Sequence, residues 1–210
     1  MTISIRIEGK TPLICNRFTD AAQMAASSGT RLSTIGDKGT PREQAETKLY
    51  RSKGSDDVLV IPSPNMFRCL IDAGTFFKVG KSKVTTLKTS MVPYCVSINE
   101  IEIAIISREG WDVDTRAVRI PSTGGRILCH RPCFNDWALE FTVELDTDVM
   151  NPKFFRELVD AAGNKIGLGD FRPATKGPYG RFAVTNWKNG EARRGLAGQG
   201  EARRGMAGQG

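Results

Sequence analysis

Hydrophobic and polar residues alternate along several stretches of the chain, and this alternation predicts half-buried strands. The first stretch places Ile3, Ile5 and Ile7 on one side and stops at Gly9. Two later stretches flank the turn sequence Ser-Thr-Gly-Gly, which predicts a β-hairpin. Together the patterns predict strands at 3–7, 13–15, 58–61, 94–98 and 101–106 (as one long strand or two), 115–120 and 126–131 (the hairpin), 138–145 and 181–187.

Apolar residues recur at helical spacing elsewhere. Pro64–Ala73 and the segment opened by Asn151-Pro152 begin at prolines, and each is followed by a glycine, so we expect helices that end at Gly74 and Gly163. A third helix is predicted from Thr40, which can form a capping box with Glu43, to about residue 50. A short helix is also predicted near 20–26, inside the polar and weakly patterned stretch 16–40.

Helices and antiparallel strands mix here without a regular β-α-β rhythm, so the chain is predicted to be an α+β protein. The last strand, helix and strand resemble half of a ferredoxin-like unit. One domain is predicted at residues 1–188. Residues 189–210 are predicted to be a disordered Arg/Gly-rich tail, because Glu191–Gly200 recurs as Glu201–Gly210 with Met206 in place of Leu196. This tail could add weak contacts to nucleic acid or be a solvated extension without a specific role.

Composition narrows the class of protein. A 40% share of hydrophobic residues is enough for a core, and no apolar run reaches the roughly 18 residues of a membrane helix. The net charge of +7 favours an anionic partner, most commonly nucleic acid. No signal peptide precedes the five scattered cysteines, so reduced thiols and a cytoplasmic location are expected.

The richest stretch for chemistry is a glycine-rich loop at 166–182, between a predicted helix and the last predicted strand. It combines glycines, which permit close backbone approach, with cations for phosphate and rings for stacking. We expect the loop to hold an extended anionic ligand through Gly167, Gly169, Arg172, Lys176, Gly177, Tyr179, Gly180 and Arg181. Further contacts are expected from a flexible basic segment and from the hairpin, at Lys78, Lys81, Lys83, Lys88, Arg116 and Arg126.

Several motifs are rejected. The Gly167-x-Gly169 pair follows a helix, whereas a dinucleotide-binding turn precedes one. Gly74–Ser82 has five residues between its glycines instead of the four of a P-loop. Cys129-His130-Arg131-Pro132-Cys133 lacks a second ligand pair for a metal. No cofactor or metal is predicted, and the only weak catalytic candidates are His130, the sole histidine, and Asp37.

The opening strand, which ends in Gly9-Lys10-Thr11-Pro12-Leu13-Ile14, and the C-terminal glycine-rich loop with Gly180-Arg181-Phe182 resemble the RAMP superfamily. This superfamily includes the RNA-binding backbone subunits of CRISPR effector complexes. The resemblance covers residues 1–187 and implies a ferredoxin-like, RRM-like core with inserted loops, binding of single-stranded RNA and assembly in several copies along the strand. The histidine of the processing nucleases in this superfamily has no counterpart near the N-terminus. Small phage-encoded relatives are also similar, which would place the protein in a host cytoplasm.

The sequence therefore predicts non-catalytic binding of single-stranded nucleic acid, with RNA favoured and single-stranded DNA an alternative. Assembly as a homo-oligomer or filament is expected, and no membrane partner is expected. Two other classes remain open: a metal-independent endoribonuclease that uses His130 or Asp37, and a structural or assembly protein of a virus.

Overall fold

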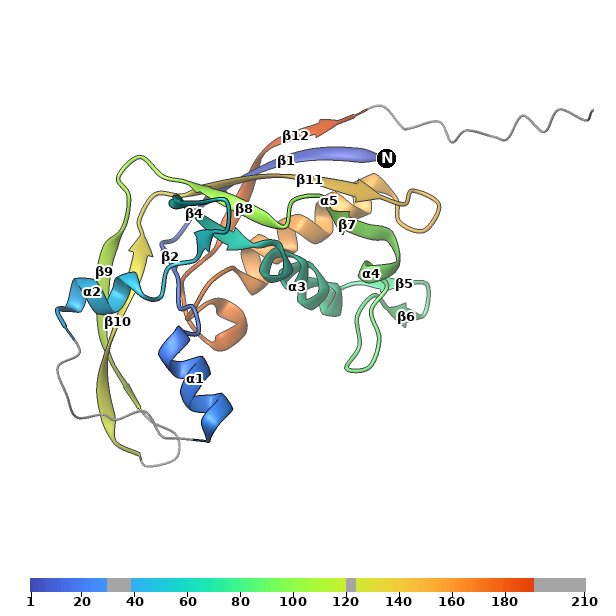
Figure 1. Ribbon diagram of the computed structural model, residues 1–210. Coiled ribbons are helices and arrows are strands. Elements are labelled where there is room, and N and C mark those ends of the chain that lie inside the picture. The colour runs from blue at the N-terminus through green and yellow to red at the C-terminus, as the bar shows by residue number, and fades with distance from the viewer. Residues whose placement is uncertain (30–38, 120–123, 191–210) are drawn as a thin grey trace, which may run out of the picture.

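The computed structural model describes residues 1–29, 39–119 and 124–190, and it is built around one antiparallel sheet (Figure 1). The strands of this sheet are, in spatial order, β12 (Phe182–Asn189), β1 (Thr2–Gly9), β11 (Ala138–Leu145), β8 (Glu102–Ile106), β4 (Ser55–Pro62) and β3 (Arg51–Ser52), with β7 (Val96–Ile98) also paired to β11. Helices α3 (Ser63–Ala73) and α5 (Pro152–Ala161) lie on one face of the sheet.

The sheet and its two helices form a ferredoxin-like core. Along the chain β1, α3, β8, β11, α5 and β12 follow one another, which is the β-α-β-β-α-β order of that unit. In space the fourth strand of the unit pairs with the first, the first with the third, and the third with the second. The predicted α+β class with a ferredoxin-like core is therefore confirmed.

The alternation of the sequence explains which face the helices cover. Ile3, Ile5 and Ile7 are each at most 2% exposed and point to the helices, where they meet apolar residues such as Phe155. In strand β12, Val184 pairs with Ile7 and Asn186 pairs with the adjacent Arg6. The strand therefore contains one extra residue between these pairs, which is a β-bulge. Because of this bulge Trp187 returns to the helical face, with its ring centroid 5.7 Å from that of Phe155.

A second sheet carries the predicted hairpin away from the core. Strand β9 (Asp112–Arg119) pairs with β10 (Arg126–Phe134), and β2 (Leu13–Ile14) pairs with the base of β10. Helix α2 (Pro41–Glu46) lies beside this hairpin (Figure 1). The hairpin is confirmed and is longer at its base than predicted. Its predicted turn at 122–125 lies partly outside the described residues.

Several predicted boundaries are wrong. The capping box of Thr40 and Glu43 forms, but α2 ends at Glu46 because the amides of Lys48 and Leu49 close tight turns. Helix α5 does not end at Gly163, since one π-helical turn (Ala162–Ile166) follows it. A Cβ atom on Gly163 would lie 2.3 Å from a carbonyl oxygen of β12, so only glycine permits this approach.

The predicted strand at 94–98 begins instead with a helical turn, α4 (Val92–Cys95), and continues as β7. Strands β7 and β8 are separate because the Glu100 side chain accepts the amide of Thr142 at 2.9 Å. The predicted helix near 20–26 is present as α1 (Asp20–Ser28). Asp37 and residues 191–210 of the tail lie outside the described residues, and Asn189, assigned to the tail, pairs in β12.

The lysine segment between α3 and α4 contains a small hairpin where a flexible loop was expected. Strands β5 (Lys78–Val79) and β6 (Ser82–Lys83) pair around Gly80, which has a φ of 61°. This segment lies beside α4, at the opposite end of the molecule from β9 and β10 (Figure 1). No helix among the described residues is both long enough and apolar enough to cross a membrane.

Candidate nucleic-acid interface

The backbone of the glycine-rich loop is bonded to the segment that follows β1. The amide of Gly180 donates to the carbonyl of Pro12 at 2.8 Å, and the amide of Asp170 donates to the carbonyl of Ile14 at 2.7 Å. Gly180 also accepts from Leu168 at 2.9 Å, and a Cβ atom on Gly180 would lie 1.8 Å from the Leu168 carbonyl oxygen. The glycines therefore serve first to bring backbone segments together.

This packing decides which loop groups can meet a ligand. The amide of Gly167 donates to Ala162 at 2.9 Å, and the amide of Gly177 donates to Arg172 at 2.9 Å. With Gly180, three of the four glycine amides predicted to hold a ligand donate to carbonyl groups inside the protein. The fourth, that of Gly169, donates to no backbone carbonyl among the described residues. The groups of this loop that remain free to contact a ligand are therefore mainly its side chains.

Two non-glycine residues of the loop have left-handed backbone conformations. Phe171 has a φ of 49° and Lys176 a φ of 66°. Such conformations cost of order 1–3 kcal/mol each and persist only where the surroundings enforce them. Both side chains are exposed, and the Phe171 ring lies 6.0 Å from that of Tyr179. The strained backbone positions of the loop thus carry one ring of an aromatic pair and a lysine on the surface.

The loop arginines are half-buried. Arg172 donates one N–H to the Gly169 carbonyl at 3.0 Å, and Arg181 donates one N–H to the Asn164 carbonyl. Within the described part of the chain neither forms an ion pair, nor does Lys176. These three cations keep their charge available to an anion.

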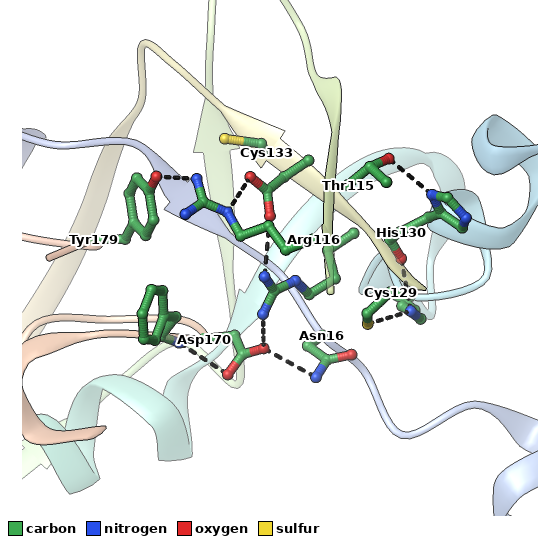
Figure 2. Close-up of polar contacts among 12 residues, drawn as sticks. Asn16, Thr115, Arg116, Cys129, His130, Cys133, Asp170 and Tyr179 are labelled. Atoms are coloured by element: carbon green, nitrogen blue, oxygen red, sulfur yellow. Dashed lines mark hydrogen bonds and ion pairs between the residues drawn. The ribbon is translucent and has the colours of Figure 1, made fainter. Parts of the chain in front are cut away.

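A network of arginine and aspartate side chains joins the loop to the hairpin (Figure 2). Arg116 of β9 donates to the Tyr179 hydroxyl, and its guanidinium carbon lies 4.9 Å from the centroid of that ring. The same guanidinium binds Asp114 at 2.7 Å. Arg131 of β10 then bridges Asp114 at 3.0 Å and Asp170 of the loop at 2.7 Å. These contacts between hairpin and loop bring residues that are 39 or more positions apart in the sequence into one surface.

Arg131 is the buried centre of this network. Its side chain is 5% exposed, and its Nε atom is the one buried side-chain polar atom without a partner among the described residues. Burial alone would lower the pKa of Arg131, but hydrogen bonds and charges from Asp170 and Asp114 raise it above its ordinary value. The two arginines and two aspartates sum to zero charge, so the network links the two elements without adding to the net charge.

The hairpin carries further cations toward its tip. Arg126 is opposite Arg119 in the register, and both are exposed. Beside them Leu128 is 65% exposed and Ile127 is 44% exposed. Arg116 thus lies midway along the ribbon and Arg126 at its outer end, and of these two predicted contact residues only Arg116 contacts the loop among the described residues.

The lysine segment borders a different hollow. Lys83 and Lys88 line it together with Arg68 of α3, whereas Lys78 and Lys81 are exposed outside it. Arg68 also lines a cavity of about 230 Å³ beside the glycine-rich loop, where Arg172 is found. Arg68 therefore lines both hollows, and its guanidinium is paired with Asp72 at 2.8 Å.

His130 is nearly buried within the hairpin. It is 9% exposed, and its Nδ1 is 2.8 Å from the Thr115 hydroxyl. The Lys48 ammonium donates to the His130 carbonyl at 2.6 Å and lies 3.2 Å from the Cys129 sulfur. Leu128 and His130 share a side of the strand, but Leu128 is exposed while His130 is buried.

Several of the cysteines are in buried environments that keep their thiols protonated. Burial raises the pKa of Cys15 to about 12, and burial also raises the pKa values of Cys69 and Cys133. Among the described residues no group of three His, Cys, Asp or Glu side chains could hold a metal ion.

The open face of the main sheet has a different character. Arg6 binds Glu140 at 2.5 Å and Glu8 at 3.0 Å. Glu144 lies on this face as well, and none of the described residues of β1, β11 and β12 places an aromatic ring there. An RRM-like mode of binding, in which bases stack on the sheet, therefore has no platform on these strands.

Comparison with known proteins supports the fold. No protein-family model matches the chain, and no curated protein matches it. The chain is similar to one in the cryo-EM structure of the Type III-B Cmr-beta bound to cognate target RNA, with a TM-score of 0.53 and 8% identity. The similarity covers 89% of this chain and 59% of that chain. At 8% identity this similarity shows the fold alone.

Proposed function

We propose that this protein binds single-stranded nucleic acid, RNA in preference to DNA, on the loop–hairpin surface and catalyses no reaction on it. The loop–hairpin surface is defined by Arg116, Phe171, Arg172, Lys176, Tyr179 and Arg181. One observation carries the proposal: the contacts of Tyr179 with Arg116 and of Asp170 with Arg131 gather cations and rings from two distant segments.

This surface has both parts that a single strand requires. Arg172, Lys176 and Arg181 lack ion-pair partners within the described residues, so binding a phosphate would not require a protein ion pair to break. Phe171 and Tyr179 offer rings on which bases can stack, at roughly 1–3 kcal/mol per base. A duplex hides its base faces, so the surface favours unpaired strands.

The preference for RNA is supported by the fold. The similar chain comes from a structure bound to target RNA, and a 2′-hydroxyl can distinguish RNA from DNA at a given site. The position of His130, with Thr115 as its hydrogen-bond partner, supports a role in structure over catalysis. Binding in several copies along one strand is part of the proposal.

Fluorescence anisotropy with short labelled RNA, DNA and duplex oligonucleotides tests the proposal. We expect RNA to bind most tightly, and affinity to fall steeply between about 50 and 200 mM salt as counterions are released. On longer RNA, light scattering should show a protein mass that grows in steps with strand length. Absence of binding to any single strand at low salt would refute the proposed function.

Cleavage is tested separately. Labelled RNA incubated with the protein in the presence of a chelator should remain full length. Discrete products that vanish in a His130→Ala variant would instead establish the endoribonuclease alternative.

A further inference from the structure

A cavity of about 230 Å³ lies beside the glycine-rich loop and shares Arg172 with the loop–hairpin surface. It lies between the loop, the first turns of α3 and the segment after β2. Its apolar lining is part of the core, since Ile61 and Leu168 are each 1% exposed. The cavity is therefore a fixed feature of the fold, because its walls cannot move without disturbing the core.

The polar groups that line this cavity include both donors and acceptors. Asn65 lies at the start of α3 and lines the cavity together with the half-buried Tyr50. Asn16 donates to Asp170 at 3.1 Å, which leaves its own amide oxygen without a partner among the described residues. Arg68 and Arg172 add two guanidinium groups. Such mixed polarity differs from a site for phosphate alone, in which donors would predominate.

The single carboxylate of the cavity is already engaged. Asp170 accepts hydrogen bonds from Arg131 at 2.7 Å, from Asn16 at 3.1 Å and from the amide of Phe171 at 2.8 Å. It cannot serve as a free ligand for a cation. A flat ligand with an apolar face and an edge of donors and acceptors fits these walls, and a nucleobase has that chemistry.

We propose that the cavity holds one unstacked base of the bound strand, with Asn65 contacting its polar edge and with Arg68 and Arg172 near the adjoining phosphates. The inference rests on the proposed function and extends it: binding becomes selective for base identity at one position per protomer. The phosphate contacts on the loop–hairpin surface carry no such selectivity.

Substitution at Asn65 separates base recognition from charge. An asparagine amide presents one donor group and one acceptor, whereas an aspartate presents acceptors only. Asn65→Asp should therefore change the order in which bases are preferred, and an added acid near the start of a helix is tolerated by the fold. Asn186→Asp is the matched control, since it adds the same charge on the open face of the sheet.

The measurement is the affinity of each variant for short adenosine, cytidine and uridine homo-oligomers at one salt concentration. We expect the affinities of the native protein to differ by at least about fivefold across the three, which is the effect of one well-placed base contact. Asn65→Asp should alter their ranking, and Asn186→Asp should preserve it.

Two outcomes would overturn the base-cavity inference and leave the proposed function standing. The native protein could bind the three oligomers with equal affinity, or Asn65→Asp could weaken binding to all three by the same factor. Failure of all three oligomers to bind at low salt would refute the proposed function itself. The two failures are thus distinguishable in one experiment.

Discussion

The open face of the sheet and the loop–hairpin surface differ in how their charges are paired. On the open face Arg6 is held between Glu140 at 2.5 Å and Glu8 at 3.0 Å, so its charge is compensated. On the loop–hairpin surface Arg172 and Lys176 form no ion pair within the described residues. The arginines that are paired there, Arg116 and Arg131, bind the two elements together.

This difference shows that a net charge of +7 does not by itself locate an anion site. What matters is which cations remain after the fold has used the others. The ferredoxin-like core could in principle bind a strand on its sheet, as RRM domains do. Here the acids of that face would repel a phosphate chain, and for this reason the strand is proposed to bind on the loop–hairpin surface.

The largest expected effect is the loss of the loop itself. Gly180→Ala would place a Cβ atom 1.8 Å from the Leu168 carbonyl oxygen at a φ of 69°. We expect the free energy of unfolding to fall by about 4 kcal/mol or more, because backbone on both sides must shift. Chemical denaturation followed by circular dichroism measures this change.

Gly80→Ala is the control for that variant, because Gly80 also has a positive φ, of 61°, but open space around its Cβ position. It should cost only the left-handed strain of roughly 1–2 kcal/mol. Equal destabilisation by the two variants would show that the close packing of Gly180 contributes nothing.

A smaller loss is expected when the connection between loop and hairpin is cut. Arg131→Met leaves Asp114 and Asp170 without their shared buried partner, and breaking such a pair should cost about 3 kcal/mol. Arg116→Met also removes a partner of Asp114, but Arg116 is 41% exposed, so the cost should stay below about 1 kcal/mol. Thermal unfolding of both variants measures whether the cost depends on burial of the arginine or only on loss of an ion pair. Equal losses of stability in the two variants would contradict a dependence on burial.

The sequence predicts much of the fold because its local signals agree with the tertiary structure. The alternation of Ile3, Ile5 and Ile7 places β1 and its buried face, and the capping box at Thr40 and Glu43 places the start of α2. Boundaries failed where a distant contact decides them. Gly163 reads as a helix end, but the approach of β12 makes it part of a π-helical turn.

The sequence predicted the cations and rings of the candidate site, but it did not predict the aspartates and the buried arginine that join the loop to the hairpin. Asp114 and Asp170 carry no sequence signal as partners of Arg131, since they lie 17 and 39 residues away. The roles of Arg68 and Asn65 arise only from the packing of α3 beside the loop. The burial of Arg131 within β10 results from tertiary packing, which the periodicity of the sequence cannot reveal.

Removal of one free cation should affect binding more than stability. Lys176→Gln is expected to weaken single-strand binding several-fold and to reduce the slope of log affinity against log salt by about 1. Lys188→Gln removes the same charge from the open face of the sheet and should change neither quantity appreciably. Anisotropy titrations at several salt concentrations compare the two, and an equal loss in both would mean that only net charge matters.

The smallest effect is expected on the open face, where Glu140→Gln removes the carboxylate that binds Arg6. Both side chains are substantially exposed, so the free energy of unfolding should change by less than about 1 kcal/mol. Because the variant gains one positive charge, it should raise affinity for RNA only slightly, through long-range attraction that is screened at about 150 mM salt. An affinity gain that persists at that salt would show that Arg6, once released, contacts the strand. The open face would then be a second binding surface, on which the acids weaken the binding of the strand. The two faces would differ only in how strongly they bind.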